Sequence, residues 1–229
     1  MVAQNVKNIK ERIVFACARA KRRPEDVTLI AVSKTFGADL VGEAAAAGVV
    51  DIGENYVQEL QKKYEMLRHE NIRWHFIGHL QSNKVKIIVP WISCIHAVDS
   101  GSLGREISKH AVKSARSVDV LIEVNTTGEP SKYGVAPDKC RLLARELVPL
   151  PGINLVGLMT MGPFLPDPEK SRPAFRSLRE LRDGLQDEGI MMSHLSMGMT
   201  NDFEVAIEEG ATMIRIGTAI FGERAARKN

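Results

Sequence analysis

The sequence has 229 residues, of which 44% are hydrophobic, 5% aromatic and 26% charged. These proportions are ordinary for a globular protein with a sizeable core, and they exclude collagen, coiled-coil rods and disordered tails. No run approaches the roughly 20 apolar residues that span a membrane, and charged residues interrupt the first segment. We therefore expect no membrane span and no secretory signal. The net charge of +3 is too small to require a nucleic-acid partner.

Cys17, Cys94 and Cys140 lie far apart in the sequence. Their spacing fits neither a disulfide framework nor a zinc site, so we expect no metal and reduced packing residues in a cytoplasmic protein. Residues 1–23 contain seven basic residues and a single acidic one. A solvated helix face explains this cluster more simply than a docking surface for an acidic partner, but the second interpretation stays open.

Residues 1–23 predict an amphipathic helix that ends at Pro24. Its apolar stripe recurs at intervals of three and four and consists of Val2, Val6, Ile9, Ile13 and Cys17. Beyond it, short apolar runs alternate with segments of helical spacing. The runs are too short for helices and are rich in branched residues, which is typical of buried parallel strands. They occupy residues 27–32, 49–52, 74–77, 94–98, 118–124, 153–159, 193–196 and 212–216.

Helical stripes separate these runs at residues 40–47, 57–67, 103–111, 143–147 and 175–185. Short helices are also expected after Gln81, Asn201 and Gly217. Eight strand–helix units over about 200 residues predict a single α/β domain, a (β/α)8 TIM barrel with an extra N-terminal helix. A doubly wound sheet usually carries a Gly-x-Gly-x-x-Gly turn after its first strand, and this turn is absent. We expect residues 1–229 to form one domain, with the helix at 1–23 and the barrel at 27–222.

TIM barrels place their active sites at the carboxyl ends of the strands, and these ends are unusually polar here. Ile30, Val32 and Lys34 share one strand face by period two, so an inward-facing Lys34 would bring an amine to the barrel mouth. Apolar surroundings would lower the pKa of this amine, and its neutral form could condense with an aldehyde. The plainer alternative is a strand-end lysine that reaches solvent or pairs with Glu54.

The last two strands are followed by small residues, hydroxyls and expected helix starts, a combination that suits a phosphate dianion. Glycines also occur at such places simply to form turns. Arg215 shares a strand face with Met213 and Gly217, and a buried guanidinium requires a partner. That partner is either a carboxylate of the protein or a ring nitrogen of a bound aromatic cofactor.

Two other patterns carry no catalytic prediction. His75 and His79 have the interval of a helical metal pair, but they lie on a strand and its exit loop, where their rings would not converge. Ser196 lacks the Gly-x-Ser-x-Gly frame of a nucleophile elbow.

Six segments, in order through nearly the whole sequence, resemble those of the pyridoxal phosphate homeostasis proteins. They are AVSKT (31–35), GENYVQE (53–59), WHFIGHLQSNK (74–84), GLMTM (157–161), LSMGM (195–199) and RIGTAIFG (215–222). The resemblance implies a barrel similar to the N-terminal domain of alanine racemase, with pyridoxal 5'-phosphate (PLP) at its mouth.

The resemblance also assigns roles to single residues. It implies that Lys34 forms the Schiff base, that Arg215 faces the pyridine nitrogen, and that Asn55 and His79 line the pocket. It assigns the phosphate cradle to Ser196, Gly198, Met199, Gly217 and Thr218. Two positions depart from the family pattern, because Thr200 replaces a serine and Gly37 stands where proline is common. Thr200 keeps a hydroxyl, whereas Gly37 would loosen the loop after Lys34.

Arginine cannot accept a proton, so it would keep the ring nitrogen neutral and weaken the electron withdrawal on which PLP enzymes depend. The resemblance further implies that alanine racemase compensates with two bases, one of them reached through a second domain that these 229 residues lack. We therefore expect no catalytic residues, but a monomeric carrier that binds and buffers PLP through a Schiff base and delivers it to apo-enzymes. The alternatives are a PLP-dependent amino-acid racemase and a Schiff-base aldolase acting on a sugar phosphate.

Overall fold

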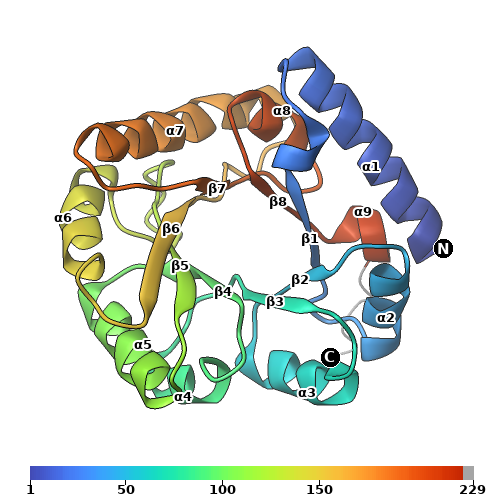
Figure 1. The fold of residues 1–229 in the computed structure, drawn as a ribbon. Coiled ribbons are helices and arrows are strands. Elements are labelled where there is room, and N and C mark those ends of the chain that lie inside the picture. The colour runs from blue at the N-terminus through green and yellow to red at the C-terminus, as the bar shows by residue number, and fades with distance from the viewer. Residues whose placement is uncertain (224–229) are drawn as a thin grey trace.

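The computed structural model describes residues 1–223. Eight parallel strands close into a barrel in the order β1 to β8, and helices surround it, which confirms the predicted TIM barrel (Figure 1). The strands are β1 (Thr28–Val32), β2 (Asp51–Glu54), β3 (Arg73–Phe76), β4 (Cys94–Val98), β5 (Val118–Glu123), β6 (Ile153–Met159), β7 (His194–Ser196) and β8 (Met213–Ile216).

Each strand is followed by helical structure, and one long helix, α1, precedes the barrel. The α-helices are α1 (Val2–Arg19), α2 (Ala38–Ala46), α3 (Val57–Leu67), α4 (Val85–Ile88), α5 (Gly101–Lys113), α6 (Pro137–Leu147), α7 (Arg172–Asp187), α8 (Phe203–Glu208) and α9 (Thr218–Phe221). The 3-10 helices are η1 (Pro24–Asp26), η2 (Ser82–Lys84) and η3 (Pro168–Ser171). The short helices expected after Gln81, Asn201 and Gly217 are present as η2 with α4, α8 and α9.

Most element boundaries differ from the prediction by one to six residues, and two of these differences have a clear physical cause. Helix α1 ends at Arg19 rather than at Pro24, because Lys21 adopts a left-handed φ of 53° and Pro24 begins η1. Strand β2 lies two residues later than the predicted 49–52. Its ends, Asp51 and Glu54, are buried and charge-paired, so hydrophobicity alone does not mark the strand.

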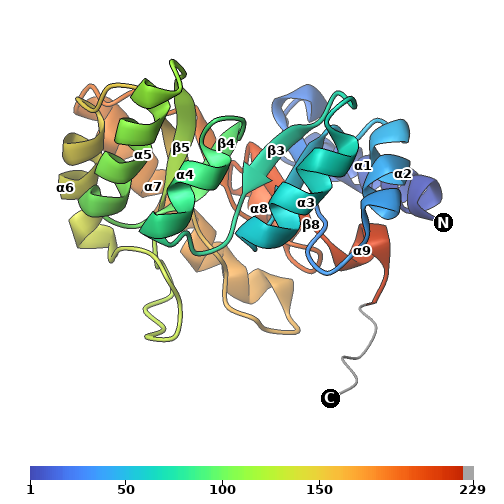
Figure 2. The same cartoon turned by 90° about the horizontal axis from the view of Figure 1, so that it is seen from below.

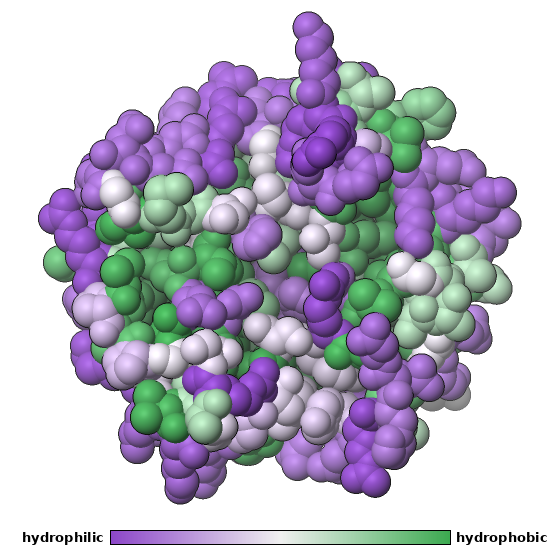
Figure 3. All heavy atoms as spheres, viewed as in Figure 1, coloured by the Kyte–Doolittle hydropathy of each residue, from purple (hydrophilic) through white to green (hydrophobic). Residues whose placement is uncertain are grey.

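The apolar residues separate into two groups. The larger group lies between strands and helices and includes the predicted α1 stripe of Val2, Val6, Ile9, Ile13 and Cys17, all buried. The smaller group lies inside the barrel, because its members come from strands on opposite sides and include Ile30, Leu121 and Met213. Burying one such side chain stabilises the fold by about 1.5–3 kcal/mol. On the face seen in Figure 3, hydrophilic residues gather at the periphery and hydrophobic ones lie nearer the centre.

Basic residues of the first segment bond to α8 and the residues after it. Arg12 pairs with Glu204 at 3.0 Å, and Arg19 pairs with Glu208 at 2.8 Å. Arg22 donates to the backbone oxygens of Ile207 and Ala211. Much of the basic cluster predicted as a solvated face therefore attaches α1 to the barrel.

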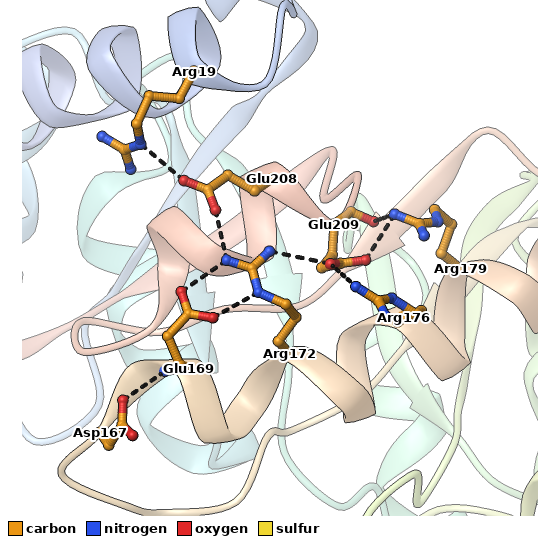
Figure 4. Close-up of polar contacts among 8 residues, drawn as sticks. All are labelled: Arg19, Asp167, Glu169, Arg172, Arg176, Arg179, Glu208 and Glu209. Carbon is orange, nitrogen blue, oxygen red and sulfur yellow. Dashed lines mark hydrogen bonds and ion pairs between the residues drawn. The ribbon is translucent and has the colours of Figure 1, made fainter.

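An ion-pair cluster joins the beginning of α7 to the end of α8 (Figure 4). Arg172 donates to Glu169, Glu208 and Glu209, and Arg19 reaches the same Glu208 from α1. Arg176 and Arg179 add two further pairs to Glu209. Exposed ion pairs contribute little singly, but a shared network restrains geometry. The cluster therefore anchors the far end of the loop that leads from β6 to α7.

The loops after β5 and β6 extend from the same end of the barrel (Figure 2). Both follow carboxyl ends of strands, the end at which TIM barrels place their sites. Within residues 1–223, no helix combines the length and apolarity needed to cross a bilayer. The three cysteines are buried and unpaired.

Candidate functional site

A pocket of about 580 Å³ opens at the carboxyl ends of the strands. This volume lies in the range of small-molecule sites, and the wall is mostly apolar with a few polar groups. Its polar lining residues include Lys34, Asn55, Thr200, Asn201, Asp202, Arg215 and Thr218; its apolar lining residues include Val32, Phe36, Ile77, Met161, Phe164 and Met199.

Lys34 lies just beyond β1 and lines the pocket together with Val32, while Ile30 lies in the interior cluster. This placement agrees with the alternation predicted for β1. The following residue, Thr35, has a φ of 72°, a left-handed conformation that is costly for a β-branched residue. The backbone N–H of Thr35 donates to Glu59 Oε2 of α3 at 2.9 Å, and this bond holds the unusual turn.

A buried ion pair between Lys63 and Glu54 holds the backbone next to Lys34 in place. Lys63 Nζ of α3 donates to Glu54 Oε1 at 2.5 Å and to the backbone oxygen of Ser33 at 2.7 Å. Glu54 also accepts from the Ser33 hydroxyl and the Asn55 N–H. Burial raises the pKa of Glu54, although Lys63 opposes the shift. Glu54 is thus the partner of Lys63, and α3 fixes the backbone on both sides of Lys34.

Arg215 lies at the floor of the pocket, on β8, and is only 4% exposed. Its Nη1 donates to Ser196 Oγ at 2.6 Å, and its Nη2 donates to the backbone oxygen of Thr160 at 2.9 Å. Burial lowers the pKa of Arg215 to about 10, with the charges of Glu123 and Asp202 opposing the shift. The guanidinium is therefore still a cation at neutral pH, and its two bonds below the pocket fix its plane.

The loop after β7 serves the fold as well as the pocket. Ser196 is fully buried, and its hydroxyl lies between Arg215 and His96 rather than in the pocket wall. Gly198 has a φ of 93°, and a Cβ there would lie 2.6 Å from the Cβ of Ala206. Only glycine therefore fits this turn against α8. Met199 lines the pocket, but its N–H donates to Asp202 Oδ1 at 2.7 Å.

The remaining predicted residues divide between pocket and rim. Asn55 lines the pocket, and its Oδ1 is buried without a hydrogen-bond donor among the described residues. Gly217 and Thr218 line the pocket at the beginning of α9. His79 lies outside the wall, where its ring stacks on Tyr133 with centroids 4.3 Å apart. The structure therefore brings Lys34, Asn55, Met199, Arg215, Gly217 and Thr218 together, and it places His79, Ser196 and Gly198 around them.

Glu123, at the end of β5, was not predicted as part of the site. Glu123 is 4% exposed, and burial raises its pKa from 4.5 to about 7, with Arg215 opposing the shift and Asp99 adding to it. A carboxylate at the end of a barrel strand could have indicated the site, but between Ile122 and Val124 it had the appearance of an ordinary strand end. His96 was missed for a similar reason, because it lies within an apolar strand.

The raised pKa of Glu123 predicts a pH-dependent stability. The folded protein keeps this proton up to about pH 7, whereas the unfolded chain releases it near 4.5, so folding stability falls as pH rises between these values. The difference between the two pKa values corresponds to about 3 kcal/mol of folding free energy. Urea unfolding at pH 4.5 and 8 should show that Glu123→Gln removes this loss. The control Glu65→Gln, at an exposed position on α3, should still lose stability between the two pH values. A pH profile of Glu123→Gln equal to that of wild type would contradict the prediction.

Known proteins match this sequence over most of its length. The family model described as alanine racemase, N-terminal domain, matches residues 4–225. A pyridoxal phosphate homeostasis protein of Aquifex aeolicus is 48% identical over 222 residues, which cover 96% of this chain and 97% of the relative.

Solved structures show the same likeness. One of an unknown protein from Bifidobacterium adolescentis has a TM-score of 0.91 at 39% identity, covering 96% of this chain and 94% of that one. PipY of Synechococcus elongatus, solved with PLP bound, has a TM-score of 0.85 at 32% identity, covering 97% of this chain and 100% of that one. The chain therefore belongs to the alanine racemase N-terminal domain family and, within it, to the pyridoxal phosphate homeostasis proteins.

Proposed function

We propose that this protein binds PLP in the pocket at the barrel mouth and acts in PLP homeostasis. One observation carries the proposal: Lys34, Arg215 and Asn55 line the same pocket, and the buried Asn55 Oδ1 has no hydrogen-bond donor within residues 1–223. The relatives bear the name of this function, and PipY was solved with PLP bound. When bound, PLP supplies an aldehyde that forms a Schiff base with a primary amine.

The pocket residues fit the groups of PLP. The buried Asn55 Oδ1 needs a donor, and the phenolic hydroxyl of PLP is one. Arg215 can only donate, which suits an unprotonated pyridine nitrogen. Lys34 would hold the aldehyde carbon. In this arrangement Asn55 would bind the phenolic hydroxyl, Arg215 the pyridine nitrogen and Lys34 the aldehyde of one PLP molecule.

The phosphate group is best accommodated near Gly217 and Thr218. The N–H of Met199 is already bonded to the carboxylate of Asp202, a residue of the pocket lining, and this charge would repel a dianion placed beside it. Gly217 precedes α9, adds no side chain, and leaves space for close approach to the backbone. The buried hydroxyl of Ser196 is engaged by Arg215, so in this proposal it orients the arginine rather than holding the phosphate.

The same arginine opposes strong catalysis. Its two bonds to the protein hold it below the pocket, and it has no proton-accepting atom with which to sustain a charged pyridine nitrogen. We therefore propose a carrier that buffers PLP and delivers it to apo-enzymes, acting as a monomer. Three buried free cysteines support placing it in the cytoplasm.

Absorption spectroscopy tests this function. Purified protein mixed with PLP and dialysed should keep a band near ~420 nm, and borohydride should then yield an adduct at Lys34. A colourless dialysed protein would reject PLP binding and leave the sugar-phosphate aldolase to be tested. Amino-acid racemisation at roughly 1 s⁻¹ or faster would show that the protein is a racemase rather than a carrier. Activation of a PLP-dependent apo-enzyme by the loaded protein, measured against an equal amount of free PLP, tests delivery.

A further inference from the structure

A row of five polar side chains crosses the interior of the barrel and ends at the pocket arginine. Arg215 Nη1 lies 2.6 Å from Ser196 Oγ, and Ser196 Oγ lies 2.9 Å from His96 Nδ1. His96 Nε2 lies 3.0 Å from His75 Nδ1, and His75 Nε2 lies 2.9 Å from Asp51 Oδ1. We call these residues the interior network; none is more than 6% exposed.

With one proton on each histidine, the bonding capacity of each group fixes the direction of the network. Arg215 can only donate, so Ser196 Oγ accepts from it and has one O–H left for His96 Nδ1. His96 must then carry its proton on Nε2 and donate to His75 Nδ1. His75 in turn carries its proton on Nε2 and donates to Asp51. One neutral tautomer of each histidine therefore satisfies every bond in the network.

The charges at both ends favour this direction. Burial raises the pKa of Asp51, but the bonds from His75 and Arg73 outweigh it and hold this pKa below its ordinary value. Asp51 is therefore an anion that accepts at one end, while Arg215 is a cation that donates at the other. Burial, with Arg215 and His75 nearby, holds the pKa of His96 well below its ordinary value. The opposite direction would require a second proton on His75.

The structure of β4 explains how His96 enters the network. The pairing of β4 with β5 shifts register between Ile95 and Val98, which is the mark of a bulge. His96 bonds to interior residues while its neighbour Ala97 belongs to the interior apolar cluster, so two consecutive residues face inward. A regular strand would have turned one of them outward. His96 keeps the alternation from Cys94, another member of that cluster, and the bulge adds Ala97 to the inward face.

We propose that His75 and His96 are positioning residues: they orient the Ser196 hydroxyl and thereby fix the guanidinium that Arg215 presents to the pocket. With its O–H directed at His96, Ser196 can offer only lone pairs to Arg215. Without that acceptor the hydroxyl can rotate, and the arginine loses a fixed partner on its inner side. This inference rests on the proposed function for its consequence on PLP, but not for the network itself.

A metal site would use the same histidines differently. His75, Cys94 and His96 bring ligand atoms within 4.8 Å of one another. A metal would need an unprotonated Nε2 on His96, whereas the network needs a proton there. Burial raises the pKa of Cys94 well above its ordinary value, which leaves a thiol rather than the thiolate a metal prefers. The protonation of one atom therefore separates the two arrangements.

Nitrogen NMR of the ligand-free protein tests the network directly. Long-range ¹⁵N–¹H spectra, assigned with His75→Gln and His96→Gln, should show both histidines neutral with the proton on Nε2. A proton on Nδ1 of either histidine would overturn the proposal. Loss of the His96 Nε2 proton on addition of zinc alone, with Cys94 shifting, would also overturn it in favour of a metal site.

The effect on Arg215 is tested with four single variants and one double variant. His96→Leu should broaden the Nε–H resonance of Arg215 and raise the dissociation constant of PLP about tenfold, and His96→Gln, which keeps an acceptor, should restore most of both. His110→Leu, outside the barrel on α5, serves as control. Ser196→Ala supplies a second route if His96→Leu does not fold: it should reproduce both changes, and adding His96→Gln to it should cause no further loss.

The outcomes separate the two proposals. If the tautomers and the Arg215 signal follow the expectation while wild-type protein binds no PLP, the function fails and the network stands. If PLP binds and neither His96→Leu nor Ser196→Ala changes its affinity or the Arg215 signal, the positioning role is wrong.

Discussion

Protein carrying Lys34→Ala should show no absorption near ~420 nm after exposure to PLP, while still binding the ligand about 10- to 100-fold more weakly than wild type. The residues that line the pocket include this lysine together with Arg215 and Asn55. Removing the amine removes the covalent bond, but the arginine, the amide oxygen and the backbone near Gly217 remain. Spectroscopy measures the first effect and equilibrium dialysis the second.

Lys34→Arg is the matched variant for this experiment. It keeps a long cationic side chain but cannot form the covalent bond, so it should also lack the band. Lys10→Ala, whose amine bonds to backbone oxygens of Ala47 and Gly48 away from the pocket, should retain it. A full-intensity band in Lys34→Ala would show that another amine holds the aldehyde.

Lys63→Met should lower the free energy of unfolding by about 3–5 kcal/mol, because it leaves the fully buried carboxylate of Glu54 without its cation. The loss should be larger at pH 8 than at pH 5. Burial already raises the pKa of Glu54, and without Lys63 the carboxyl stays protonated to higher pH, so its ionisation costs stability as pH rises. Urea unfolding at the two pH values measures both effects.

Two controls make this result specific. Lys62→Met, one residue earlier and exposed, should change stability by less than about 0.5 kcal/mol. The double variant Glu54→Gln with Lys63→Met removes both charges and should recover much of the loss. In the double variant the Ser33 oxygen keeps the bond from the Phe36 N–H but still lacks the one from Lys63, so the PLP band should stay weaker than in wild type. Equal stability of Lys63→Met and wild type would contradict the buried pair.

Much of the fold follows from local patterns. Period-two alternation in β1 placed Lys34 toward the pocket, and the same alternation in β8 placed Arg215 there. The stripe of α1 was predicted residue by residue, because an amphipathic helix needs only one buried face. These features depend on neighbours in the sequence, and so a single sequence is enough to predict them.

Other parts of the site depend on distant partners. Lys63 lies beside a predicted helical stripe, and lysine at such a position is usually solvated. It is buried here because it pairs with Glu54. His96 faces inward by alternation with Cys94, but its partners His75 and Ser196 lie on other strands, so no local pattern predicted the contacts. Ser196 lies in a loop that suggests phosphate binding, but its hydroxyl is taken by two groups from other strands. Each case was decided by contacts formed only when the barrel closed.

The closed sheet has a consequence for abundance. A protein that buffers a metabolite must be present at a concentration comparable with that of the metabolite it holds. Open sheets at such concentrations risk intermolecular strand addition at their exposed edges. In this barrel β8 pairs with β1, so each strand has a neighbour on both sides and offers no such template. The architecture is therefore suited to accumulation, and we expect the protein to remain dispersed where an edge-bearing sheet would associate.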